Sequence, residues 1–208
     1  MRRWLAVVAA GGVLATGGCG GGEPSPPSTT PATDHAAPTS PAPHRTAPTG
    51  RDRVRHGIAV PGARFPLHKA VAIRFHAGRR TATLAVKIRS ITRGRPRQLK
   101  PLGLGRKVRG MYPYYIRFAV KNLSRTDLSR AWIKDLVGVD DHGREARHVL
   151  VIGPFPRCPA SRAPRHFATG DLATLCSLAV APRGVRVTGA RWRGEPYGPA
   201  TDRAVTWK

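Results

Sequence analysis

Histidine, cysteine and aspartate side chains could give this 208-residue chain acid–base, nucleophilic or metal chemistry, and they are scattered along it. Two of the eight histidines fall in a proline-rich stretch, His142 follows Asp140-Asp141, and only the fold could bring His148 and His166 together. The chain has no G-x-S-x-G elbow, no H-E-x-x-H motif and no glycine-rich phosphate loop. We therefore expect no catalytic residue, no cofactor and no metal, and we expect Asp140-Asp141 to form a hairpin turn.

Cys19 has a distinctive setting near the start of the chain. It follows two arginines, an uncharged apolar run over residues 4–15 and three small residues. The run has the length of a signal-peptide core and is too short to span a bilayer of about 30 Å. This order resembles a bacterial lipoprotein signal, which implies cleavage before Cys19, a diacylglycerol on its sulfur and a place on the outer face of the cytoplasmic membrane. The alternative is a secreted protein, cut after Gly17 or nearby, with Cys19 free.

The segment after Cys19 is rich in proline, threonine, serine and alanine. Eight prolines lie between Gly20 and Arg55, and no apolar periodicity appears there. Such a segment buries too little apolar surface to offset its ordering entropy, so we expect a disordered tether. Its reach is on the order of 110 Å if extended and about 30 Å as a flexible coil. The predicted organisation is a signal peptide at 1–18, a lipidated linker at 19–55 and a folded domain at 56–208.

The chain is strongly basic, with 36 Lys and Arg against 11 Asp and Glu and a formal charge of +25. The cations are spread along the chain, with clusters at 51–55 and 93–97, the second of which continues to Lys100, Arg106, Lys107 and Arg109. An exported protein of this charge is attracted to phospholipid headgroups and anionic wall polymers. The alternative interpretation is that the charge only forms a solvated surface and reflects the codon bias of the genome. We expect no specific nucleic-acid binding, because no such motif accompanies the charge.

Cys158 and Cys176 form an even pair in a chain that we expect to be exported. Oxidising compartments favour disulfides, and a bridge that closes this loop would stabilise the fold by about 3 kcal/mol. Neither a C-x-x-C spacing nor paired histidines nearby supports a metal site. We therefore predict a disulfide between these two residues.

Short stretches with apolar residues at every second position recur from residue 71 to the end of the chain. Glycine, proline and aspartate turns separate them, for example at 77–80, 140–143 and 181–184. Period two is that of a half-buried strand, and no run of about 12 residues or more has the pattern of an amphipathic helix. The predicted strands cover 71–75, 84–88, 114–120, 133–139, 149–151, 176–180, 185–192 and 205–207. The pattern predicts an all-β sandwich or barrel with a long irregular loop at 153–171.

A family resemblance is carried by the run PYYIRFAVKNLSRTDL (Pro113 to Leu128), then VGVDDHGR, Cys158, HFATGDLATLCSLAVAPRG and a final RW. It resembles the immunoglobulin-like extracellular domains of actinobacterial lipoproteins. In that group one strand ends V-x-N-x-S, the next ends D-x-x-G, and a cysteine pair brackets F-x-x-G before a P-x-G turn. The match covers most of residues 80–192 and consists of strand and turn signatures, which identify a fold rather than an activity. It implies an immunoglobulin-like β-sandwich outside the membrane, with the cysteine pair bridged.

The densest aromatic group comprises Trp132 and the tyrosines within residues 112–115. On a central strand of a sandwich such residues ordinarily belong to the core. The alternative is an exposed aromatic face that binds a partner. Tyr112 and Tyr115 are the candidates for that face, because we place them opposite Ile116 in the alternation.

These observations favour a non-enzymatic, lipid-anchored surface module that binds a partner such as another envelope protein. A second hypothesis is an electrostatic binder of anionic envelope polymers, whose binding would collapse as salt rises. A third is an envelope hydrolase with an unrecognised site, which predicts a deep pocket with titratable groups of perturbed pKa.

Overall fold

A computed structural model describes residues 54–159, 161–200 and 202–208 of the chain. Cys19, the predicted signal peptide and nearly all of the predicted linker lie outside the described residues. The first described strand, β1 (Val54–Arg55), begins two residues before the expected start of the folded domain at 56. In the described part of the chain, no helix is both long enough and apolar enough to cross a membrane.

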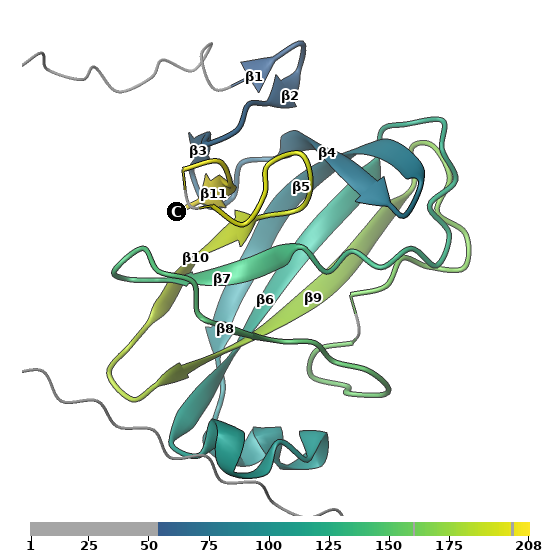
Figure 1. Cartoon of the computed structure of the whole chain (residues 1–208). Helices are drawn as coiled ribbons and strands as arrows, with labels where there is room; N and C mark the ends of the chain where they lie inside the picture. Colours follow the sequence, from purple (N-terminus) through teal and green to yellow (C-terminus); the bar gives the residue numbers. More distant parts are fainter. Residues whose placement is uncertain (1–53, 160, 201) are drawn as a thin grey trace, which may run out of the picture. The chain divides into compact units, whose positions relative to one another are not determined.

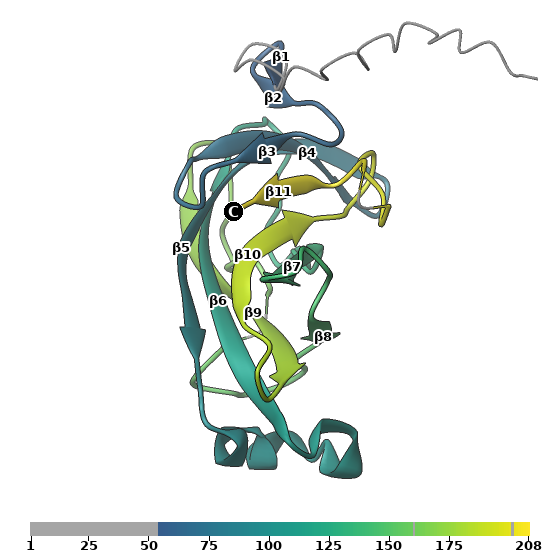
Figure 2. The ribbon, with the colours of Figure 1, turned by 90° about the vertical axis from the view of Figure 1, so that its left-hand side faces the viewer.

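Two main β-sheets pack face to face, as the two views of the ribbon show (Figures 1 and 2). The antiparallel five-stranded sheet has the order β4 (Val71–Ala77), β5 (Arg80–Arg93), β6 (Met111–Asn122), β9 (Leu172–Pro182), β8 (Arg147–Val149). The four-stranded sheet has the order β3 (Arg64–Phe65), β11 (Val205–Trp207), β10 (Val187–Trp192), β7 (Leu136–Asp140), and only β3 and β11 pair in parallel. A small hairpin joins β1 to β2 (Ile58–Ala59). The prediction of an all-β, sandwich-like fold is confirmed.

The main hydrophobic core lies between the two sheets, and the period-two pattern explains how it forms. Alternate residues of a strand point to opposite faces, so Leu84, Val86 and Ile88 of β5 all face inward and are fully buried. Across the core, the rings of Phe75 and Trp192 meet edge to face with their centroids 6.0 Å apart. Burial of large aromatic side chains from both sheets therefore holds the sandwich together.

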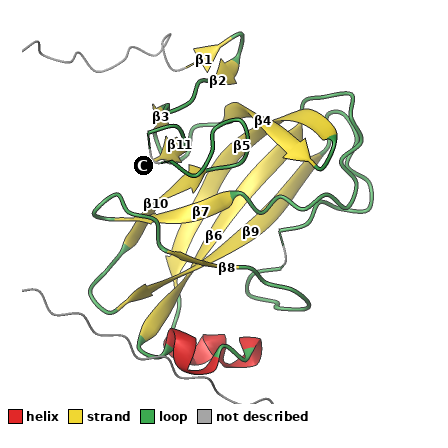
Figure 3. Cartoon of the chain, viewed as in Figure 1, coloured by secondary structure: helices red, strands yellow, loops and turns green. Residues whose placement is uncertain are grey.

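Two short 3-10 helices lie between β5 and β6, where no helix was expected. They are η1 (Pro96–Leu102) and η2 (Gly105–Val108), and they lie together at one end of the five-stranded sheet (Figure 3). A 3-10 turn has the apolar period of neither a strand nor an α-helix, so periodicity does not reveal it. The expected irregular loop at 153–171 is confirmed, since its described residues form no named strand or helix before β9.

Candidate functional site

A second, smaller hydrophobic cluster covers part of the outer face of the five-stranded sheet. Tyr115 of β6 pairs with Leu178 of β9, and both point away from the main core. The buried members of this outer cluster are Leu99, Tyr115, Val151, Phe155, Cys158, Cys176, Leu178 and Val180. Because they come from η1, from β6 and β9 and from the loop after β8, burial of the outer cluster fixes these segments to one another.

The predicted disulfide between Cys158 and Cys176 is present, with a Cα–Cα distance of 5.2 Å. It ties the loop after β8 to the outer face of β9, and both cysteines are buried. The same loop places Phe155 against Tyr115, with ring centroids 6.3 Å apart. The disulfide and the aromatic contact together hold this loop over the sheet.

On the other side of Tyr115, the chain between β5 and η1 packs closely against the ring. The Tyr115 hydroxyl donates a hydrogen bond to Oε1 of Gln98 over 3.2 Å, and the backbone N–H of Arg95 donates to the same oxygen over 3.0 Å. Gly94 makes this approach possible, because a Cβ there would lie 2.3 Å from Gln98 Oε1 and 2.8 Å from the Tyr115 ring. The first turn of η1 is thereby positioned beside the tyrosine.

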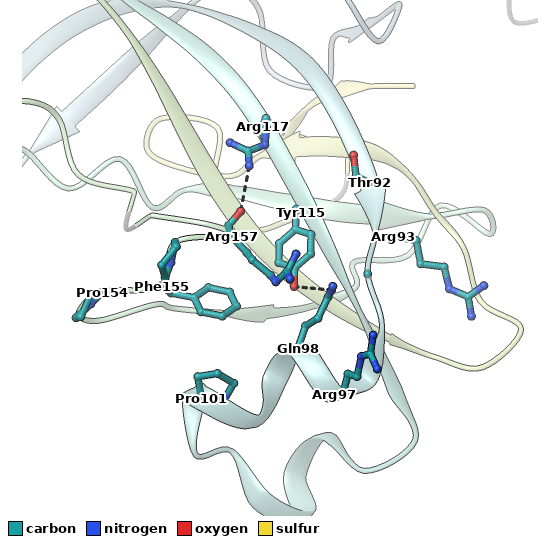
Figure 4. Close-up of a pocket in the computed structure, with 12 residues that line it drawn as sticks. Thr92, Arg93, Arg97, Gln98, Pro101, Tyr115, Arg117, Pro154, Phe155 and Arg157 are labelled. Atoms are coloured by element: carbon teal, nitrogen blue, oxygen red, sulfur yellow. Dashed lines mark hydrogen bonds between the residues drawn. The ribbon is translucent and has the colours of Figure 1, made fainter.

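An open groove of about 850 Å³ lies between η1 and the loop after β8 (Figure 4). Tyr115, Phe155 and three prolines supply its apolar surface. Its polar surface is strongly basic, since four of its twelve lining residues are arginines: Arg93, Arg97, Arg117 and Arg157. No lining residue is acidic, and none is a histidine or a cysteine. We call this feature the arginine groove.

Three of the four guanidinium groups face the groove. Arg117 extends from the outer face of β6 and donates from Nη2 to the backbone oxygen of Arg157 over 3.2 Å. The side chain of Arg157 runs toward the Tyr115 hydroxyl, and Arg97 projects from η1 beside Gln98 (Figure 4). These three arginine residues are exposed to solvent.

Arg93 is turned to the opposite side of the sheet. Its guanidinium carbon lies 3.8 Å from the centre of the Tyr112 ring, the geometry of a cation–π contact. In Figure 4 it points away from the other three arginines. The register between β5 and β6 shifts between Ile88 and Ser90, a β-bulge that changes how the end of β5 presents its side chains.

The arginine groove has no carboxylate to balance its charge. Among the described residues, every side-chain ion pair uses Asp140, Asp141 or Glu145, and none of these three lines the groove. Guanidinium groups placed together without counter-charges repel one another, and an anion bound between them relieves that repulsion. A carboxylate or phosphate can accept two parallel hydrogen bonds from a single arginine. The arrangement can therefore bind an anionic group.

Tyr115 contributes a neutral hydroxyl rather than a phenolate to this site. Burial raises the pKa of Tyr115 above its usual value, and the nearby charge of Arg157 lowers it by a smaller amount. A raised phenol pKa keeps the proton in place near neutral pH. The ring therefore serves as an apolar floor, and its hydroxyl proton is donated to Gln98.

The two tyrosines singled out from the sequence do not share a face. Tyr115 lies on the face opposite Ile116, as expected, but it is only 7% exposed. Tyr112 lies on the same face as Ile116, half-buried against the main core, so its expected orientation was wrong. The physical reason is parity, because residues 112 and 116 are four apart on one strand and must point the same way.

The other candidates for chemistry serve mainly as structure. Oδ1 of Asp140 accepts hydrogen bonds from the backbone N–H groups of His142 and Arg144, over 3.0 and 2.8 Å, which confirms the expected turn. His148 lies on β8, whereas His166 lies in the loop before β9. No three His, Cys, Asp or Glu side chains among the described residues come together as metal ligands.

Comparisons of the chain with protein-family models, with curated proteins and with solved structures found no match. The assignment of the arginine groove as a candidate site therefore depends on its geometry alone. The basic cluster at 93–97 is evident from the sequence, but nothing in the sequence joins it to Arg117 or Arg157. These two residues lie 20 and 60 positions beyond Arg97, and no motif links them.

The disulfide predicts a measurable change in stability and in loop exposure. Replacing both Cys158 and Cys176 by alanine should lower the free energy of unfolding by about 3 kcal/mol, because the open chain gains conformational freedom. The loop after β8 should also become a better protease substrate, since nothing else ties it covalently to β9. Urea denaturation and limited trypsin digestion, with mass spectrometry of cleavage after Arg157, measure the two effects. Unchanged stability and unchanged cleavage would contradict this role of the bridge.

Proposed function

We propose that this chain is a non-enzymatic, lipid-anchored binding module of the cell surface, and that its arginine groove binds anionic groups of a ligand in the cell envelope. The observation that carries the proposal is that three exposed arginines from η1, β6 and the loop after β8 line one groove. These segments are held in place by the outer cluster, so the charges are preorganised before a ligand arrives. The lining offers hydrogen-bond donors but no carboxylate, imidazole or thiol, which favours binding over hydrolysis.

The strand order supports an immunoglobulin-like arrangement within the sandwich. Immunoglobulin constant-type domains pair strands A, B, E and D in one sheet and C, F and G in the other. With β6 taken as strand B, β5-β6-β9-β8 corresponds to A-B-E-D, and β7-β10-β11 corresponds to C-F-G. The disulfide departs from the antibody pattern, because it joins a loop to β9 rather than strand B to strand F.

The arginine groove lies at the end of the domain away from its first two strands. Within the unit Arg45–Lys208, η1 and η2 lie at the opposite end from the hairpin of β1 and β2 (Figure 1). A lipid on Cys19 would hold this domain from the β1 end of the chain.

The anchor has a direct test. When cells that express the full chain are fed a clickable fatty acid, the protein should become labelled and should fractionate with membranes, because the sulfur of Cys19 would carry the lipid. Cys19→Ser should abolish the label and release the protein. Export without label in the unmutated chain would show a secreted protein instead.

The arginine groove is tested by binding of a small polyanion. Isothermal titration of the full chain carrying Cys19→Ser should show saturable binding of tripolyphosphate. The double variant Arg117→Gln with Arg157→Gln should weaken this binding about tenfold or more, because each charged hydrogen bond contributes about 1.5–3 kcal/mol.

A matched control separates the groove from overall charge. Arg79→Gln with Arg125→Gln removes the same two charges at exposed positions, one in the turn between β4 and β5 and one in the loop after β6. This variant should bind tripolyphosphate within about twofold of the parent, since long-range charge effects are screened at physiological salt. Equal losses in both double variants would contradict a defined site, and no binding by the parent would refute the proposed function.

A further inference from the structure

A second hollow lies directly beside the arginine groove. It has a volume of about 650 Å³ and lies between η1 and η2. Four of its lining residues are basic, namely Arg97, Lys100, Arg106 and Arg109, and none of its lining residues is acidic. Arg97 also lines the arginine groove, so the two hollows meet at this residue. We call this second hollow the loop subsite.

The walls of the loop subsite are fixed to the rest of the fold. Leu99 of η1 is buried in the outer cluster. Arg147 of β8 donates a hydrogen bond from Nη1 to the backbone oxygen of Lys107 over 2.7 Å, which ties η2 to the sheet edge. Gly103 and Gly105 have positive φ angles of 61° and 55° and no atoms near the place of a Cβ, so a ligand can approach the backbone closely.

The continuity of positive charge favours one extended ligand over two separate ions. Apart from Arg93, which turns away, six cationic residues line the two hollows, with Arg97 common to both. A chain with repeated negative charges can contact both hollows at once, and the second contact then forms at a high effective concentration. Each cation that it neutralises also releases counterions, which strengthens binding at low salt.

The apolar surface argues against a ligand that is recognised through nucleobases. Binding of single-stranded nucleic acid relies on aromatic faces on which bases stack. The two aromatic residues of the arginine groove, Tyr115 and Phe155, are only 7% and 4% exposed. The loop subsite has no aromatic lining residue. The charged groups themselves are therefore what these surfaces can recognise, and arginine forks match phosphate oxygens in pairs.

We infer that the arginine groove and the loop subsite together bind one linear phosphate-bearing polymer without bases, which runs past Arg97 from one hollow into the other. This inference rests on the proposed function and deepens it, because it names the class of the anionic ligand. The protein then discriminates by chain length, since only a long chain reaches both hollows.

The test compares a short and a long phosphate chain on the full chain carrying Cys19→Ser. The dissociation constant of one protein molecule for long-chain polyphosphate should be at least about tenfold lower than for tripolyphosphate, because the long chain adds contacts in the loop subsite. Its affinity should also fall more steeply with salt, because more counterions are released. The triple variant Lys100→Gln, Arg106→Gln, Arg109→Gln should lose this advantage, so that its affinity for the long chain approaches that for tripolyphosphate.

Each remaining outcome has a definite meaning. Tripolyphosphate binding that depends on Arg117 and Arg157 without any gain from chain length would overturn the two-hollow inference and leave the proposed function standing. Absence of binding to either phosphate chain would overturn both. Equal affinity for polyglutamate of matched length would refute the assignment to phosphate, and tighter binding of single-stranded DNA of matched charge would refute the assignment to a polymer without bases. Circular dichroism of every variant serves as the control for folding.

Discussion

The burial of the Tyr115 ring on the outer face of β6 is the contact on which the site depends. Its ring is held between η1, through Gln98 and Gly94, and the loop after β8, through Phe155. The disulfide fixes that loop to β9 on the same outer face of the sheet. Without this small outer cluster, the arginines would project from three unrelated segments. With it, they line one groove whose floor is apolar and whose rim is basic.

The unbalanced positive charge of the groove determines which kind of ligand it can bind. The few carboxylates of the described chain that form ion pairs do so around β7 and β10, and the arginines at the η1 end are left without such partners. Solvent and salt screen the resulting repulsion only in part, so an anion that enters the groove removes an unfavourable interaction as well as forming favourable ones. The cost of holding the arginines together is met by burial of the outer cluster, which is independent of the ligand.

The sequence was a good guide where the structure repeats and a poor one where it does not. Strand alternation predicted the sandwich because each strand has one buried face, and counting cysteines predicted the bridge. The 3-10 helices could not be predicted from the sequence, because the segment with Pro96, Pro101 and the following glycines has no regular spacing of apolar residues. The arginine groove could not be predicted either, because Arg117 and Arg157 become neighbours of η1 only through strand pairing and the disulfide. Tyr112 shows the reverse case, since strict strand parity puts it on the same face as Ile116, although we had predicted the opposite face.

The central claim is that anions bind at the groove and not over the whole basic surface. A two-dimensional NMR titration of the arginine Nε–Hε groups with tripolyphosphate tests it most directly, since each of the 29 arginines can report for itself. The account predicts early, saturable shifts for Arg97, Arg117 and Arg157, with little change at Arg79 and Arg125. Shifts of similar size spread over most arginines, without saturation, would contradict a defined site and leave only a diffuse basic surface.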